Sequence, residues 1–205
     1  MDVTNEKDVK RAVSKSINSF GGIDILVANA GFASAALFEK TSSKLWDKNM
    51  DILSKGCFLI SREVYQKMIE QKNGGSIIFV SSKNSLNASK GASAYSVAKS
   101  SLLHLSRSIA LEGSSHKIRS NVVNPDAVIK NSKIWKGDWT KQRAKSNKIK
   151  VNQVEEFYKN RSLLKVSILP EDIAEGIYFF ASSKSKKSTG NIINIDGGNI
   201  TSFTR

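Results

Sequence analysis

Short apolar runs alternate along the chain with longer stretches in which apolar residues recur at helical spacing. The short runs predict strands at 23–28, 76–81, 118–123 and 191–195. The longer stretches predict helices at 9–19, 45–71, 95–111 and from 170 onward. Strands that alternate with helices of this length predict an α/β fold, a parallel sheet covered on both faces.

One long region breaks this alternation. Residues 127–165 have no regular apolar pattern, and they follow Asn124-Pro125 at the end of the third predicted strand. Parallel α/β folds bind ligands beyond the carboxyl ends of their strands. We therefore expect one domain over residues 1–205, with a basic substrate-loop insert at about 127–165.

Composition limits the class of protein. With 205 residues, 40% of them hydrophobic, the chain can bury one sizeable core. Its single cysteine, Cys57, forms no intrachain disulfide, which suits a reducing cytoplasm. No apolar run is long enough to span a membrane, and the residues after Met1 do not resemble a signal peptide. We expect a cytoplasmic protein without a membrane partner.

The net charge of +14 raises the possibility of nucleic-acid binding. Most basic residues, however, are spread along the chain. The densest run, 133–150, holds seven basic residues and one acid, interleaved with Trp135 and Trp139. This pattern favours a solvated or lid-like insert over a nucleic-acid surface.

Ser82, Tyr95 and Lys99 are the strongest candidates for chemistry. Tyr95 and Lys99 are four residues apart, so a helix places them on one face. An ammonium beside a phenol favours the phenolate and lowers its pKa. Such a phenol can exchange a proton with a substrate oxygen, to which Ser82 can donate a hydrogen bond. A lone Tyr-x-x-x-Lys is a weak signal, but the strand and serine before it strengthen the hypothesis.

Six motifs together resemble the short-chain dehydrogenase/reductase family in order and spacing. They are Asp2-Val3-Thr4, Asn29-Ala30-Gly31, Ser82, Tyr95-x-x-x-Lys99, Asn124-Pro125 and Asp196-Gly197-Gly198. The resemblance implies a Rossmann-like doubly wound sheet and hydride transfer between NAD(P) and a small alcohol or aldehyde. It also implies a homo-oligomer, a dimer or tetramer.

A narrower resemblance comes from the segments 124–128, 132–135, 163–173 and 189–193. They are similar to the C-terminal dehydrogenase domain of bifunctional rhamnulose-phosphate aldolase/short-chain dehydrogenase proteins. That resemblance implies oxidation of lactaldehyde in the breakdown of rhamnose.

The family resemblance implies a role for each matching residue. Tyr95 would be the general acid/base, Lys99 would lower its pKa and hold the nicotinamide ribose, and Ser82 would orient the substrate oxygen. NAD is the expected cofactor, with NADP left open. The implied cofactor-binding residues are Asp2, Val3, Asn29, Ala30, Gly31, Tyr95, Lys99, Pro125 and Val128.

The sequence lacks the glycine-rich loop with which this family holds the pyrophosphate. We therefore expect an N-terminally truncated fold without the first three strands, in which the strand at 23–28 becomes an apolar edge. The chain alone is expected to bind NAD weakly or not at all. The alternative hypothesis is a non-catalytic remnant of a dehydrogenase domain that cannot bind cofactor alone.

Two further departures concern single residues. Leu53 stands where the family commonly has an asparagine behind the lysine, and Asn49, one turn earlier, either substitutes in part or lies on the helix surface. Asp126 replaces the glycine that usually follows the proline, and it either contacts substrate or shapes the turn.

The other candidates have simpler interpretations. His104 and His116 have no partner at metal-ligand spacing, so no metal is expected. Cys57 is interpreted as a packing residue. Trp135 and Trp139 either cap a substrate pocket or pack the insert onto the domain.

Overall fold

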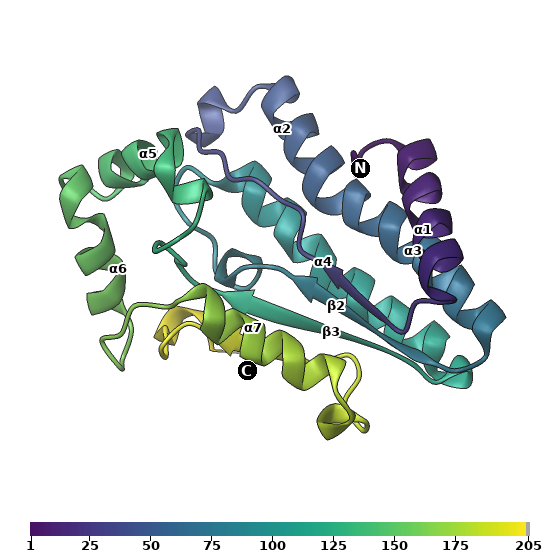
Figure 1. The fold of residues 1–205 in the computed structure, drawn as a ribbon. Helices are drawn as coiled ribbons and strands as arrows, with labels where there is room; N and C mark the ends of the chain where they lie inside the picture. The colour runs from purple at the N-terminus through teal and green to yellow at the C-terminus, as the bar shows by residue number, and fades with distance from the viewer. Residues whose placement is uncertain (204–205) are drawn as a thin grey trace.

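The computed structural model, which describes residues 1–203, contains a four-stranded parallel sheet (Figure 1). The strands lie in the order β1-β2-β3-β4, so each pairs with the next one along the chain. They are β1 (Ile25–Ala28), β2 (Gly75–Val80), β3 (Ile118–Pro125) and β4 (Ile192–Ile195). All four predicted strands are confirmed, with ends that differ by one or two residues.

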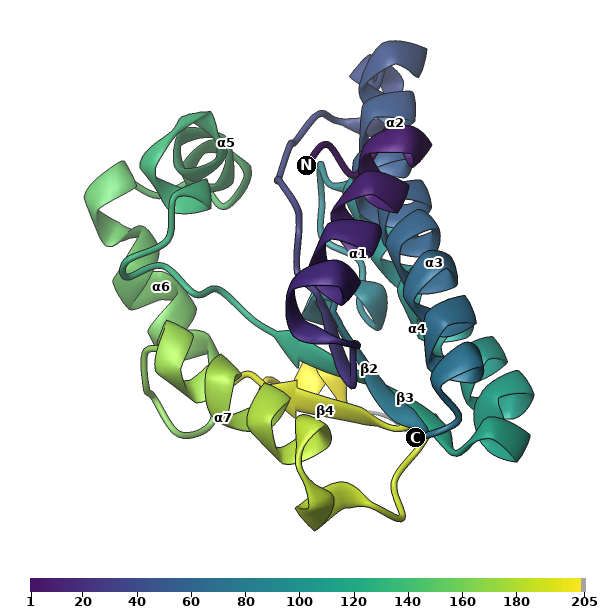
Figure 2. The same ribbon diagram turned by 45° about the vertical axis from the view of Figure 1, so that its right-hand side comes forward.

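Helices cover both faces of the sheet, as the sequence predicted. On one face lie α1 (Glu6–Phe20), α3 (Gly56–Gln71) and α4 (Ser93–Gly113), while α7 (Pro170–Ala181) lies on the other (Figure 2). The side chain of Asn5 accepts hydrogen bonds at the start of α1, and Gly21, with a φ of 83°, ends it.

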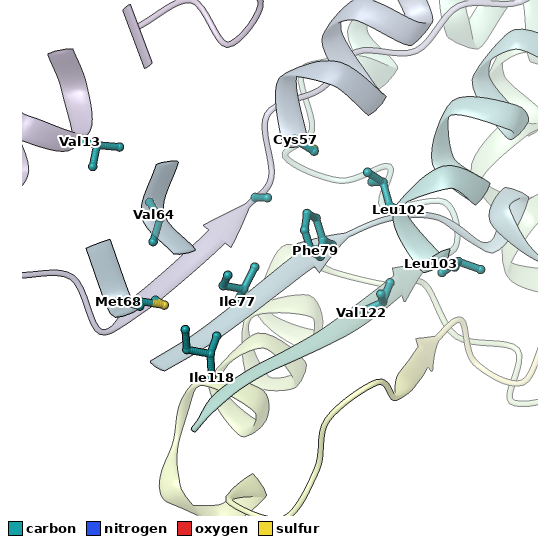
Figure 3. Packing of buried hydrophobic residues seen from close by; sticks show 11 residues of the cluster. Val13, Cys57, Val64, Met68, Ile77, Phe79, Leu102, Leu103, Ile118 and Val122 are labelled. Carbon is teal, nitrogen blue, oxygen red and sulfur yellow. The ribbon is translucent and has the colours of Figure 1, made fainter. Parts of the chain in front are cut away.

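The core has two parts, one on each face of the sheet. Ile77 and Phe79 of β2 pack into a cluster with residues of α3 and α4, including Met68 and Leu102 (Figure 3). Their neighbours in β2 point the opposite way, and Ile78 packs in a second cluster that includes Phe180 of α7 and Val123. This alternation explains why β2 reads as a continuous apolar run.

The helical stretch predicted at 45–71 is confirmed, and it contains a π-helical segment that the sequence did not predict. The segment divides into α2 (Ser43–Asn49), a π-helical segment η2 (Met50–Lys55) and α3. In η2, Leu53 is fully buried and packs against Gly31, where a β-carbon would lie 3.2 Å from Leu53 Cδ2. A π-helical turn changes the helix register locally without a signature in the apolar pattern.

The region expected to be irregular, 127–165, contains two short helices. They are α5 (Asp138–Ser146) and α6 (Val154–Arg161). The buried residues of α5 are Trp139, Arg143 and Ala144. Because an arginine occupies one of the buried positions, the apolar residues of α5 do not form a clear amphipathic pattern, and the helix could not be predicted.

Strand β1 forms one edge of the sheet within the described residues. Its side chains Ile25 and Val27 are 47% and 39% exposed, although both are large and apolar. This agrees with the expected apolar edge. Within residues 1–203, no helix combines the length and apolar character needed to cross a membrane.

Candidate active site

A cavity of about 650 Å³ lies beyond the carboxyl ends of the strands. In Figure 1, β2 and β3 point toward the side of the molecule that carries α5 and α6. The turn after β1, the residues after β2 and β3, the start of α4, and parts of α5, α6 and α7 all contribute to its walls. This is the position in which parallel α/β folds bind ligands, and its size suits a small molecule.

Most of the residues predicted from the sequence line this one cavity. They are Asn29, Ala30, Gly31, Ser82, Tyr95, Lys99, Pro125 and Val128. Asp2 and Val3 do not line it. Asp2 accepts hydrogen bonds from the backbone N–H (2.9 Å) and hydroxyl (2.8 Å) of Thr4. Val3 packs on Gly56, and a β-carbon added at Gly56 would lie 2.8 Å from Val3 Cγ2.

The electrostatics of Tyr95 differ from the expectation. Burial raises the pKa of the Tyr95 phenol, the Ser82 hydroxyl opposes that rise, and the Asp126 carboxylate adds to it. The ammonium of Lys99 donates a 2.7 Å hydrogen bond to the carbonyl oxygen of Val80. The expected lowering of the Tyr95 pKa by Lys99 is therefore wrong for this arrangement, in which burial outweighs the hydrogen bond.

Lys99 is itself an unusual lysine. Burial lowers the pKa of its ammonium from 10.5 to about 8. Between these two values the unfolded chain binds more protons than the folded chain, so the free energy of unfolding rises with pH. The contribution of Lys99 to stability is thus least favourable below pH 8.

This pKa gives a test in stability. Relative to Lys99→Met, the wild-type chain should gain up to about 3 kcal/mol of unfolding free energy as the pH rises from about 7.5 to 10.5. Urea denaturation across this pH range measures the difference. Lys15→Met, at an exposed position of α1, is the matched control and should follow the wild type. A difference that stays constant with pH would contradict the prediction.

An aromatic row connects Tyr95 to the insert. The Tyr95 ring lies 5.8 Å from Trp139, which lies 6.1 Å from Trp135, which in turn lies 5.2 Å from Tyr158. All four residues line the cavity. The sequence left two alternatives for the tryptophans, a wall of the pocket or packing of the insert. Both apply, because the rings form a wall of the cavity and also pack the insert onto α4.

Asp126 is held in place by its neighbours. Its two carboxylate oxygens accept hydrogen bonds of 3.0 and 2.7 Å from Arg161, and Asn199 donates a third of 2.9 Å. These bonds tie the end of β3 to α6 and to the C-terminal segment. Asp126 therefore shapes this turn, and it also lines the cavity.

Asn49 does not lie on the helix surface, which corrects that interpretation. It is fully buried, and its amide donates to Ser34 Oγ (2.9 Å) and to the Leu45 carbonyl (2.7 Å). It does not line the cavity.

Cys57, as expected, belongs to the packed core, where burial raises the pKa of its thiol.

We did not identify two buried cations in the cavity wall, Lys83 and Arg143, from the sequence. Lys83 had a signal that could have been used, because it directly follows Ser82 at the carboxyl end of a strand. Arg143 had none, since it reaches the site from α5 through the tertiary fold. Among the described residues, no group of His, Cys, Asp and Glu is arranged to hold a metal ion.

Comparison with known proteins agrees with the fold. Residues 1–199 match a family model described as enoyl-(acyl carrier protein) reductase. The chain is 50% identical over its whole length to the uncharacterized oxidoreductase YuxG of Bacillus subtilis, of which it spans 30%. It is 31% identical to the 3-oxoacyl-[acyl-carrier-protein] reductase FabG of Thermotoga maritima, with 97% of this chain and 74% of that protein covered.

Among solved structures, sorbitol-6-phosphate 2-dehydrogenase SrlD from Erwinia amylovora superposes with a TM-score of 0.92. It is 31% identical, and the match covers 97% of this chain and 77% of that one. The fold and these similarities define a chain with a Rossmann-like sheet that is similar to oxidoreductases. The chain belongs to the short-chain dehydrogenase/reductase family.

Proposed function

We propose that this chain carries the catalytic half of a dehydrogenase that transfers hydride between NAD(P) and a small alcohol or aldehyde. The observation that carries the proposal is the meeting of Ser82, Tyr95 and Lys99 in one cavity at the carboxyl ends of the strands. Membership of a family of oxidoreductases supports it. When bound, the nicotinamide ring accepts or donates the hydride.

The side chains supply the proton and the orientation. The phenol of Tyr95 exchanges a proton with the substrate oxygen, and Ser82 donates a hydrogen bond to that oxygen. Lys99 uses one of its three donors on Val80, which leaves two for the ribose hydroxyls of the cofactor. Because burial raises the pKa of Tyr95, its protonated form suits carbonyl reduction, and alcohol oxidation requires a cation to stabilise the phenolate.

The residues present fit only part of the cofactor. Asn29, Gly31, Pro125 and Lys99 line the cavity at the position proposed for nicotinamide and ribose. The 205 residues contain no glycine-rich loop for the pyrophosphate. The proposed adenine contacts of Asp2 and Val3 stay predictions.

Calorimetric titration of this 205-residue chain with NAD tests whether its residues bind only part of the cofactor. We expect weak or undetectable binding, because the backbone N–H groups that hold the pyrophosphate in a dinucleotide fold are not among these residues. A longer form that adds a glycine-rich segment should bind at least about tenfold more tightly. Micromolar affinity of the 205-residue chain for NAD would contradict the prediction.

We propose lactaldehyde as the substrate, with rhamnose breakdown as the setting. The resemblance to the dehydrogenase domain of bifunctional aldolase proteins supports this choice. So does the length of the Bacillus subtilis relative, which leaves room for a second enzyme domain. The hydrate of the aldehyde would lose hydride from carbon and a proton from oxygen, giving the carboxylic acid. Lactaldehyde-dependent reduction of NAD by the longer protein is the direct assay.

The rival proposal is a non-catalytic remnant that keeps the fold without turnover. The presence of Ser82, Tyr95 and Lys99 in one cavity favours the enzyme over this rival. An in-frame glycine-rich segment encoded directly upstream of Met1 would decide for the enzyme.

We also propose a cytoplasmic homo-oligomer. The exposed side chains of Phe58 on α3 and Val97 on α4 support this proposal.

A further inference from the structure

Lys83 is a buried cation in the cavity wall, without an acidic partner among the described residues. It begins the short turn η3 (Lys83–Ser85) directly after Ser82, and only 5% of it is exposed. Its ammonium donates one hydrogen bond, of 3.0 Å, to Ser89 Oγ. An ammonium has three donors, so two of them have no protein acceptor.

Such a group is costly to bury. Removing an ammonium from water without compensation disfavours its charged form. The pKa of Lys83 is lowered to about 8, chiefly by burial; Arg161 and Arg143 contribute to the lowering, whereas Asp126 and Asp196 oppose it. With a pKa near 8, Lys83 still carries its charge at neutral pH.

Arg143 brings a second cation to the same cavity from α5. It is 4% exposed, donates from Nε to the Tyr158 hydroxyl (3.1 Å) and from Nη1 to the Lys90 carbonyl (2.9 Å). Its guanidinium also lies over the Trp139 ring, 5.3 Å from the centroid. All of these partners are neutral, so its positive charge is not offset by a carboxylate within the described residues.

Two acidic residues near the cavity, Asp126 and Asp196, act on Lys83. Arg161 forms a bidentate ion pair with Asp126. The carboxylate of Asp196 accepts hydrogen bonds from the backbone of Gly198 and Asn199. The residues that line the cavity include four cations, Lys83, Lys99, Lys133 and Arg143, and one acid, Asp126. Among the described residues, the cavity wall therefore carries an excess of positive charge.

We propose that Lys83 and Arg143 form an anion-binding subsite for a carboxylate or phosphate group of the substrate or product. The subsite shares its cavity with Tyr95, so the inference rests on the proposed function. It narrows the substrate class to compounds that carry such a group or that, like a hydrated aldehyde, yield one on oxidation. An anion would accept hydrogen bonds from the free donors of Lys83 and offset the free-energy cost of burying two cations. A carboxylate is also what oxidation of a hydrated aldehyde yields.

Paired probes test the subsite through binding alone. Calorimetric titration compares lactate with lactamide, and glycerol 3-phosphate with glycerol, so that each pair differs in its charged group. We expect at least one anion to bind about tenfold or more tightly than its neutral counterpart, a difference of about 1.4 kcal/mol. Preference within the first pair identifies a carboxylate site, and preference within the second a phosphate site.

Variants of the two cations complete the test. Lys83→Met and Arg143→Met should each reduce the preference for the anion by about tenfold. Lys83→Arg and Arg143→Lys should retain most of it, which separates loss of charge from loss of fold. Lys15→Met, which removes an exposed lysine of α1, should leave the preference unchanged. Equal affinity for charged and neutral probes, or a preference that survives Lys83→Met, would overturn the proposal.

The result is separable from the proposed reaction. Tyr95→Phe should keep the anion preference while it loses turnover, since the phenol is not part of the subsite. If Tyr95→Phe instead keeps full turnover, the proposed function fails and the binding test still stands on its own readout.

Discussion

Replacing Tyr95 by Phe, in a form of the protein that binds NAD(P), should lower NAD(P)-linked turnover by about 10²- to 10⁴-fold, the usual contribution of general acid–base catalysis. The substitution removes one oxygen, the group that would pass the proton. The ring remains, so its packing against Trp139, 5.8 Å away, should persist. The rate of change in nicotinamide absorbance at saturating substrate measures the effect.

Tyr178→Phe is the matched control for this experiment. Tyr178 lies on α7 and is 59% exposed, and it does not line the cavity. Loss of its hydroxyl should leave turnover within a factor of about two, because surface substitutions of this kind change little. Undiminished turnover in Tyr95→Phe would rule out the proposed proton transfer.

Replacing Phe79 by Ala should lower the free energy of unfolding by about 3–5 kcal/mol. Phe79 is fully buried in β2, within the cluster that joins the sheet to α3 and α4 (Figure 3). Its removal leaves a cavity that rigid strands on both sides cannot close. Urea denaturation followed by circular dichroism gives the value.

Phe38→Ala provides the comparison, because Phe38 is 80% exposed. Its unfolding free energy should stay within about 0.5 kcal/mol of the wild type. If Phe79→Ala lowered the free energy of unfolding no more than Phe38→Ala does, the placement of Phe79 at the centre of the core would be contradicted.

The strands and helices could be predicted because their burial leaves a direct mark on the sequence. β2 reads as a continuous apolar run since Ile77 and Ile78 face two separate clusters. The paired Tyr95 and Lys99 could be predicted too, since a helix turns through 3.6 residues and brings them to one face. These are local relations, and local spacing is what a single sequence records.

The features that the sequence missed depend on contacts between distant segments. The Lys99 ammonium turns to the Val80 carbonyl, and the Tyr95 ring packs beside Trp139 of the insert. Arg143 joins the cavity wall only because α5 folds back across the site. The π-helical turn at Leu53 adds no residue type that distinguishes it from an ordinary helix.

The aromatic row beside Tyr95 has an optical consequence. Two of the three tryptophans in the chain, Trp135 and Trp139, line the cavity, whereas Trp46 lies in α2 outside it. Most of the intrinsic fluorophores of this protein thus stand at the site proposed for catalysis. Their emission should change when a molecule enters the cavity, so the protein carries its own reporter of occupancy, and Trp46→Phe would remove the background.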